Sequence, residues 1–219
     1  MPLFELNDEL IFPHPDLAEA DGLLAIGGDL NPERLLLAYS NGIFPWYNPG
    51  EPIQWWSLNP RLILYPDKFK CSDSLRRTLK SEKYEVKINR NFRLVLENCA
   101  NAKRKGETGL GTWISEEMMD AYTKLHEMGY AHCIETHYKG EMVGGLYGVG
   151  LGKIFVGESM FYTQRDASKV ALFHLVEIAK KNGLHFIDAQ QSTPHLISLG
   201  AEEIPRKKYL KLLKKALEE

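Results

Sequence analysis

The chain has 219 residues and a formal net charge of −2, and 44% of its residues are hydrophobic and 26% charged. This is ordinary globular composition, which argues against disorder, collagen and coiled coil. No apolar run is long enough to cross a bilayer, and no signal peptide is recognisable, so we expect a cytoplasmic protein. Cys71, Cys99 and Cys133 are few and scattered, which fits a reducing compartment.

The net charge hides a change of sign near residue 60. The first 60 residues carry nine acidic side chains and one basic side chain, a charge of −8, whereas the rest carry 26 basic and 20 acidic side chains, a charge of +6. This shift predicts two units, which we place at residues 1–61 and 62–219. The positive excess of the second unit fits either an ordinary solvated surface or one that binds a polyanion.

The first unit is rich in turn-forming residues and holds three of the four tryptophans: Trp46, Trp55 and Trp56. One helix is predicted there. Asp29 or Asn31 can cap it, Pro32 suits its first turn, and Gly42 stops it. A unit this short buries little surface alone, so we expect it to pack on the second unit.

The second unit reads as alternating strands and helices. Periodicity predicts strands at residues 62–65, 84–88, 131–137, 141–149, 153–159 and 184–190. It predicts helices at residues 74–83, 91–103 and 115–128, one that opens with a capping box at 163–166 and ends at Gly183, and one at 207–218. Consecutive strands, then a helix, then a strand indicate an α+β fold with a mixed sheet.

Two acids at strand ends are the first candidates for chemistry. Asp188 and Gln190 share one side of their predicted strand, so a carboxylate and an amide point the same way. This suits orienting an amine or receiving its proton, and a carboxylate that caps the next turn explains it equally well. Glu158, which follows the apolar run 154–156 after one glycine, can likewise be a functional carboxylate or one that only caps a strand end. Two acids at the ends of neighbouring strands favour a shared cleft.

Two loop tryptophans are candidates for ligand binding. Trp46 lies in a turn-rich stretch, and Trp113 follows a glycine-rich one. A loop tryptophan can stack on a nucleobase for about 1–3 kcal/mol. It can also plug a domain interface, which we favour for Trp55 and Trp56.

A metal site is not predicted. The candidate ligands have spacings that match no standard zinc pattern: His126, His132, Cys133 and His137. The sequence also contains neither a Gly-x-Ser-x-Gly nucleophile elbow nor a Walker phosphate-binding loop.

Longer motifs recur in a fixed order along the chain, among them DGLLAIGGDL at 21–30, GIFPW at 42–46, TWI at 112–114, VGGLYGV at 143–149, GESMF at 157–161, ASK at 167–169, IDAQ at 187–190 and SLGA at 198–201. Such a series is far more specific than any one motif. Together these motifs make the sequence resemble the leucyl/phenylalanyl-tRNA–protein transferases, from about Phe12 to the terminal helix.

The resemblance implies an aminoacyltransferase that moves Leu, Phe or Met from aminoacyl-tRNA to proteins that begin with Arg or Lys, marking them for N-degron degradation. It implies a small N-terminal α/β domain followed by a GCN5-related acetyltransferase-like domain, an α+β fold. No metal or nucleotide cofactor and no membrane are expected, and the protein is expected to be a monomer.

The resemblance also implies roles for single residues. Asp188 would keep Gln190 polarised, and Gln190 would hold the attacking α-amine. Glu158 would help to hold the acceptor or the aminoacyl group. Trp46 and Trp113 would stack near the terminal adenosine of the tRNA. Phe155 and Met160 would line an apolar pocket for the side chain of the donor amino acid.

The tRNA is expected to meet basic helices through its phosphates. The helix predicted at 74–83 is our first choice because it carries a cluster of cations: Arg76, Arg77, Lys80 and Lys83. The basic helix at 207–218 is the second choice.

The sequence departs from the family's usual pattern at four places. Ala189 stands where Cys is usual, Leu58 where Pro is usual, and Thr193 begins a run that usually carries an Asn. Tyr162 replaces a small Ser and is expected to trim the donor pocket.

Two other classes stay open. An acyl-CoA-dependent N-acetyltransferase of the same fold would bind pyrophosphate on a glycine-containing loop before a helix. Here the stretch 163–169 contains no glycine, which counts against that class. A non-catalytic RNA-binding module would explain the charge and the tryptophans and would leave Asp188 and Gln190 unused.

Overall fold

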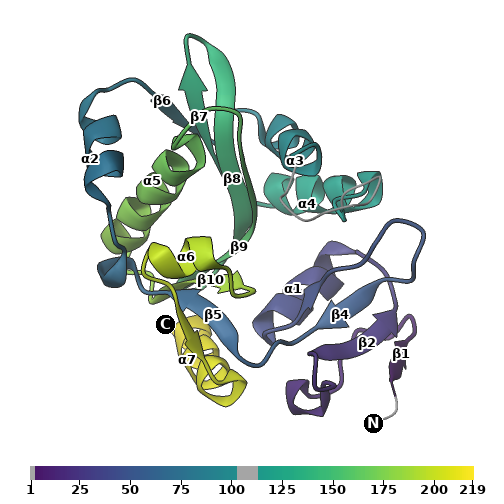
Figure 1. Ribbon diagram of the computed structural model, residues 1–219. Coiled ribbons are helices and arrows are strands. Elements are labelled where there is room, and N and C mark those ends of the chain that lie inside the picture. The colour runs from purple at the N-terminus through teal and green to yellow at the C-terminus, as the bar shows by residue number, and fades with distance from the viewer. Residues whose placement is uncertain (1–2, 103–112) are drawn as a thin grey trace.

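The computed structural model describes residues 3–102 and 113–219 and contains two β-sheets (Figure 1). A four-stranded sheet lies in the N-terminal part of the chain, and a seven-stranded sheet forms the larger part. The last residue of the helix predicted at 91–103, and Thr112 of the motif at 112–114, lie outside the described residues. Within the described ranges, no helix has the length and apolarity needed to cross a membrane.

The N-terminal sheet has the order β1-β2-β4-β3 and consists of β1 (Phe4–Leu6), β2 (Leu23–Gly27), β4 (Gln54–Trp56) and β3 (Phe44–Pro45). Helix α1 (Pro32–Ser40) begins at Pro32 and ends before Gly42, as predicted, although the N-cap residue Asn31 makes no side-chain hydrogen bond to the helix. Gly42 has a φ of +73°, a conformation that glycine adopts at little cost.

The larger sheet has the order β11-β5-β10-β9-β8-β7-β6. Its strands, in that order, are β11 (Glu202–Ile204), β5 (Arg61–Leu64), β10 (Phe186–Gln190), β9 (Ile154–Tyr162), β8 (Glu141–Leu151), β7 (Ala131–Tyr138) and β6 (Glu85–Ile88). The pair β9 and β10 is parallel, and the other pairs are antiparallel. The predicted α+β fold with a mixed sheet is therefore confirmed.

Helices cover both faces of this sheet (Figure 1). Helix α5 (Ala167–Lys181) packs on one face with the short α6 (Pro194–Ser198), and α2 (Asp73–Lys80) lies beside it. The other face is covered by α3 (Phe92–Ala100), α4 (Glu116–Glu127) and α7 (Arg206–Glu218), together with the N-terminal unit.

Two details of the predicted helices are wrong. The capping box at 163–166 does not form, because the residue that precedes α5, Asp166, is left-handed (φ +65°) and makes no capping hydrogen bond. Its carboxylate instead accepts hydrogen bonds from Thr78 Oγ1 and Lys169 Nζ, both at 3.2 Å. Helix α2 ends at Lys80, three residues early, so Lys83 lies outside the helix, in the segment between α2 and β6.

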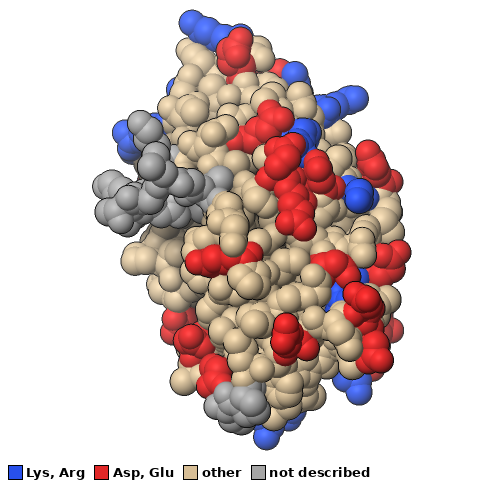
Figure 2. All heavy atoms as spheres, turned by 90° about the vertical axis from the view of Figure 1, so that its right-hand side faces the viewer, with Lys and Arg blue, Asp and Glu red and all other residues tan. Residues whose placement is uncertain are grey.

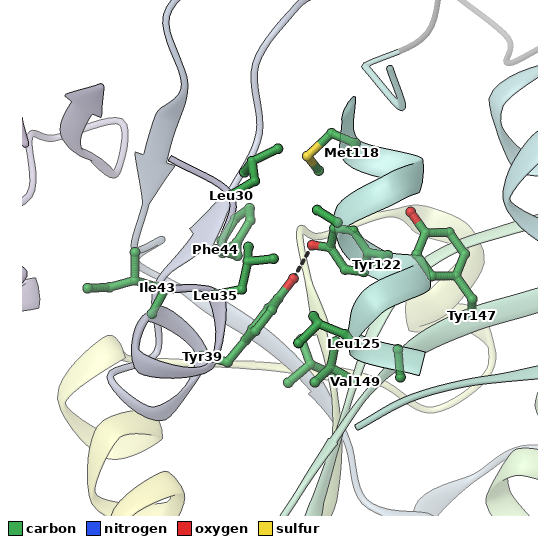
Figure 3. Close-up of a cluster of buried hydrophobic side chains, with 14 of the residues drawn as sticks. Leu30, Leu35, Tyr39, Ile43, Phe44, Met118, Tyr122, Leu125, Tyr147 and Val149 are labelled. Atoms are coloured by element: carbon green, nitrogen blue, oxygen red, sulfur yellow. Dashed lines mark hydrogen bonds between the residues drawn. The ribbon is translucent and has the colours of Figure 1, made fainter. Parts of the chain in front are cut away.

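A continuous hydrophobic core joins the N-terminal unit to the large sheet. Leu30, Leu35 and Phe44 face Met118 and Tyr122 of α4 across the boundary (Figure 3). The prediction that the first unit packs on the second is confirmed. Trp55 is completely buried in this core. Trp56 is only half-buried and lines a hollow with Trp46, so it does not simply fill the interface as expected.

Candidate active site

The end of β10 carries the two residues that the sequence singled out. The pairing of β10 with β5 shifts register between Asp188 and Gln190, so Ala189 is an extra residue and the regular alternation predicted for this strand is broken. Gln190 has a φ of +58°, a left-handed conformation that is uncommon for residues with a side chain. Asp188 is completely buried and Gln190 is almost buried.

Glu158 and Gln190 are in direct contact. The prediction that Glu158 ends its strand is wrong, because β9 continues to Tyr162 and Glu158 is an extra residue where its pairing with β8 shifts register. Gln190 Nε2 donates a hydrogen bond of 2.9 Å to Glu158 Oε1. Because the amide nitrogen is occupied in this way, the Gln190 carbonyl oxygen is left to accept a hydrogen bond from another group. The pair therefore combines an acceptor with an adjacent carboxyl group.

Two tyrosines from helices α1 and α4 form a hydrogen-bonded chain that ends at Glu158. Tyr122 of α4 donates its hydroxyl to Glu158 Oε2 at 3.1 Å, and the hydroxyls of Tyr122 and Tyr39 of α1 are hydrogen-bonded to each other (Figure 3). Burial raises the pKa of both tyrosines well above the usual value, so both stay protonated at neutral pH.

The environment of Glu158 changes its acidity. Burial raises its pKa to about 7, and the charge of Asp188 acts in the same direction, against the lowering effect of the hydrogen bonds from the tyrosines and Gln190. A carboxyl group with a pKa near neutral pH can accept a proton and release it again under physiological conditions.

Asp188 is fully engaged by other groups. Its Oδ1 accepts hydrogen bonds from Arg61 Nε and from the backbone N–H of Gln190, both at 2.9 Å. Its Oδ2 accepts from Arg61 Nη2 and from the hydroxyl of Tyr209, both at 2.7 Å. A carboxylate has about four lone-pair sites, so Asp188 has none left for a proton from a substrate.

A hollow of about 520 Å³ lies at the boundary between the units, where Gln191 and Ser192, the residues that follow Gln190, are among its lining residues. Trp46, which is 38% exposed, lines it with Trp56, and their ring centroids are 5.7 Å apart. The other lining residues are Asp21, Leu58, Asn59, Pro60, Gln191, Ser192 and Glu203. Two acidic side chains and two aromatic rings thus border a cavity that begins one residue after Gln190.

The remaining predicted substrate contacts lie apart from this hollow. Trp113 is partly buried against the core shared by the two units. Phe155 is buried in the apolar cluster beneath α5, and Met160 packs against the same cluster, whereas the tyrosines that hold Glu158 belong to the opposite core. Tyr162 is 66% exposed, so the expectation that it trims a pocket with Phe155 is not supported by its position.

The four cations predicted to bind tRNA do not form one continuous site: two of them line a hollow and two lie outside it. Arg77 and Lys83 line a hollow of about 420 Å³ between α2 and the start of α5, together with Arg165. Arg76 and Lys80 are exposed on α2 and are not among its lining residues. Acidic side chains dominate the face shown in Figure 2, which is the right-hand side of Figure 1 and includes the N-terminal unit and α4. Helices α2 and α5 lie at the left of Figure 1, on the opposite side of the molecule.

The four possible zinc ligands serve other contacts. His126 stacks on Phe92 with ring centroids 4.3 Å apart, and the His137 Nε2 atom lies 3.0 Å from the Glu135 carboxylate. Within the described ranges, no group of three potential ligands is placed to hold a metal ion.

Several residues that build the site were not predicted, namely Arg61, Tyr39, Tyr122 and Tyr209, and Arg165 of the basic hollow. A signal existed for one of them, because Arg61 opens an otherwise apolar strand and an unpaired buried cation is costly. The tyrosines come from α1, α4 and α7, and nothing in their local sequence marks them as partners of Glu158 or Asp188.

Comparison with known proteins identifies the family of the chain. The leucyl/phenylalanyl-tRNA protein transferase family matches residues 63–214, and the N-terminal domain of the same family matches residues 28–59. A leucyl/phenylalanyl-tRNA–protein transferase from Thermodesulfovibrio yellowstonii is 54% identical over 100% of this chain and 88% of its own length. Another, from Maridesulfovibrio salexigens, is 52% identical over 100% of this chain and 90% of its own length.

The protein is therefore an enzyme of the aminoacyltransferase class. The chain belongs to the leucyl/phenylalanyl-tRNA–protein transferase family.

Solved structures with a similar fold are more distant. L-PGS from Bacillus licheniformis is 14% identical, with a TM-score of 0.44 that covers 84% of this chain and 70% of that one. A GCN5-related N-acetyltransferase from Kribbella flavida is 7% identical, with a TM-score of 0.40 that covers 78% and 59% of the two chains. No argument about function rests on similarities at this level.

Proposed function

We propose that this enzyme transfers Leu, Phe or Met from aminoacyl-tRNA to the α-amine of proteins that begin with Arg or Lys, marking them for N-degron degradation. The observation that carries the proposal is the contact between Gln190 and Glu158, which sets an amide acceptor beside a carboxyl group whose pKa is raised to about 7. An attacking amine needs both an acceptor to orient it and a base to take its proton.

The chemistry is aminolysis of an ester that is already activated. The α-amine nitrogen attacks the carbonyl carbon, a carbon–nitrogen bond forms, and the carbon–oxygen ester bond breaks with its electrons moving to the ribose oxygen. The Gln190 carbonyl oxygen orients the amine, Glu158 takes the proton from its nitrogen, and Glu158 then gives that proton to the ribose oxygen as it leaves. Holding amine and ester in attack geometry can supply up to about 7–11 kcal/mol without a covalent intermediate.

The basic acceptor residue is proposed to enter the hollow beside Gln190. Asp21 and Glu203 supply negative charge there, and an arginine or lysine side chain can also lie over the ring of Trp56. Trp46 is proposed to stack on the terminal adenosine at the same mouth, and Trp113 to support it from the adjacent core.

The donor side chain is proposed to meet the apolar cluster of Phe155 and Met160. Met adapts to differently shaped partners, which suits Leu, Phe and Met as donors. Charged donors are excluded because an unpaired charge is costly to bury. Discrimination against a Cβ-branched donor such as Ile is expected to be partial, because one misplaced methylene group is worth about 1–3 kcal/mol.

The tRNA backbone is proposed to bind along α2 and the start of α5. Arg77, Lys83 and Arg165 around one hollow support this proposal. Arg76 and Lys80 extend the positive surface along α2, and the cations of α7 are a second surface. Contacts of this kind recognise phosphates without reading bases.

We further propose that residues 1–61 and 62–219 are separate domains, and that the enzyme is a cytoplasmic monomer. Two sheets on either side of residue 60 support the division, although β5 begins one residue before the second domain. The free cysteines Cys71, Cys99 and Cys133 suit a reducing compartment.

A transfer assay tests the proposed function. Labelled Leu-tRNA, Phe-tRNA and Ile-tRNA are offered at equal concentration with peptides that begin with Lys, Arg or Ala and are otherwise identical. We expect Leu and Phe to be transferred to the Lys and Arg peptides, and Ile to react poorly. Transfer to the Ala peptide at the same rate, or efficient transfer of Ile, would contradict the proposed specificity.

A further inference from the structure

Arg61 occupies the most enclosed position of any cation near the site. Its side chain is 1% exposed, and its guanidinium carbon lies 4.7 Å from the ring centroids of both Phe44 and Tyr209. Besides its two hydrogen bonds to Asp188, it approaches the carbonyl oxygen of Gly42 through Nη1 at 3.4 Å. Every face and edge of the guanidinium is therefore in contact with protein.

The groups around Asp188 come from three distant parts of the chain. Arg61 begins β5, Tyr209 lies in α7, and Gly42 and Phe44 belong to the N-terminal unit. A planar guanidinium that binds a carboxylate through two parallel hydrogen bonds fixes both the position and the rotation of that carboxylate. Tyr209 fixes the second oxygen from the side of α7.

Asp188, held in this way, in turn fixes the backbone of Gln190. Its Oδ1 holds the backbone N–H of Gln190, the residue whose left-handed conformation ends the strand. A left-handed conformation in a residue with a side chain persists only where the surroundings impose it. The Gln190 amide reaches Glu158 from this backbone position, so the orientation of the amide depends on the placement of Asp188.

We propose that Arg61 and Tyr209 are positioning residues for aminoacyl transfer, which fix Asp188 and thereby set the Gln190 backbone and amide in the geometry of attack. Asp188 is then an anchor and not the acceptor of the substrate proton. The proposal rests on the proposed function, because the attack it refers to is that of the acceptor α-amine. It also explains why a buried ion pair is kept at this place, where apolar residues would pack at least as well.

Tyr209→Phe is the most informative variant, because it removes one hydrogen bond and keeps the ring that covers Arg61. The matched control is Tyr130→Phe, which changes a partly exposed tyrosine between α4 and β7. The number of folded sites is counted by stoichiometric binding of Leu-tRNA. Loss of folded protein therefore does not count as loss of turnover.

We expect Tyr209→Phe to lower kcat about tenfold, and Arg61→Lys about a hundredfold, because hydrogen bonds to a charged group are lost in each. The Kd for Leu-tRNA and the KM for the acceptor peptide should stay within about twofold of wild type. Hydrogen exchange of the Gln190 N–H, followed by NMR, should be faster in Tyr209→Phe than in Tyr130→Phe.

Equal per-site kcat in Tyr209→Phe and Tyr130→Phe would overturn the proposal, as would unchanged exchange of the Gln190 N–H. The exchange measurement needs no transfer activity. A wild-type enzyme that transferred no leucine would therefore refute the proposed function, while the exchange result would still decide whether Tyr209 and Arg61 position Gln190.

Discussion

At the scale of single residues, the proposed mechanism gives Gln190 the role of orienting the amine and Glu158 the role of accepting its proton. Gln190 cannot ionise, so it offers an acceptor at every pH, and its nitrogen is held by Glu158. Glu158 is held in turn by Tyr122, whose hydroxyl is backed by Tyr39. This chain of donors keeps the carboxyl group in place while burial keeps its pKa near neutrality.

Replacement of Gln190 tests the orienting role. We expect Gln190→Ala to lower kcat about a hundredfold, because a misplaced amine loses the advantage of attack geometry. Leu-tRNA binding should change little, since Gln190 carries no charge. Gln164→Ala, a glutamine on the loop before α5, is the control. Equal losses of kcat and of tRNA affinity would argue against a role in the chemical step.

The acidic rim of the hollow gives a test of acceptor recognition. Asp21→Asn with Glu203→Gln should raise the KM for a Lys-initiated peptide about fivefold, because exposed ion pairs contribute up to about 1 kcal/mol each. The kcat and the Kd for Leu-tRNA should stay close to wild type. Asp67→Asn with Glu127→Gln removes two exposed acids elsewhere. A KM equally raised in both double variants would show that net charge, and not the hollow, is responsible.

At the scale of elements, the long periodic segments could be predicted and the short ones could not. Strands β7, β8 and β9 and helices α4 and α5 span several periods, and the sequence pattern located all of them. Strands β1, β3, β4 and β11 have two or three residues, too few for any period to be visible.

The site itself could be predicted only in part. Asp188, Gln190 and Glu158 were singled out because each is a polar residue after an apolar run, a local signal, although Glu158 lies in the middle of β9 and not at its end. The bulge at Ala189 and the engagement of Asp188 by Arg61 were not found, since they depend on pairing with β5, 127 residues away in sequence. Tertiary contacts of this separation leave no mark in a window of neighbouring residues.

The basic hollow between α2 and α5 predicts a salt dependence. The triple variant Arg77→Ala, Lys83→Ala and Arg165→Ala should reduce the slope of log Kd for tRNA against log salt by about three, because each phosphate contact contributes about one. Exposed lysines at other places supply a control of equal charge: Lys124, Lys180 and Lys181 replaced by Ala. An unchanged slope in the first variant would place the tRNA elsewhere, with α7 as the next surface to test.

At the scale of the whole molecule, the N-terminal unit is part of the site and not an appendage. Tyr39 crosses to Tyr122, and Gly42 and Phe44 contact Arg61, so the first unit contributes to the support of both Glu158 and Asp188. The hydrophobic core runs without a break beneath these contacts (Figure 3). Of the two acids that line the hollow proposed for the acceptor, Asp21 belongs to the first unit and Glu203 to the second, whereas the three cations of the hollow proposed for tRNA all belong to the second unit.

The pH dependence of single-turnover leucine transfer, in the wild type and in Glu158→Gln, tests the central claim most directly. A carboxyl group with a pKa raised to about 7 must lose its proton to act as a base, so the wild-type rate should rise through about pH 7. In Glu158→Gln that rise should vanish, leaving a slower reaction that follows only the acceptor α-amine, whose pKa is about 8. The same pH profile and the same rate in both proteins would contradict the assignment of Glu158 as the proton acceptor.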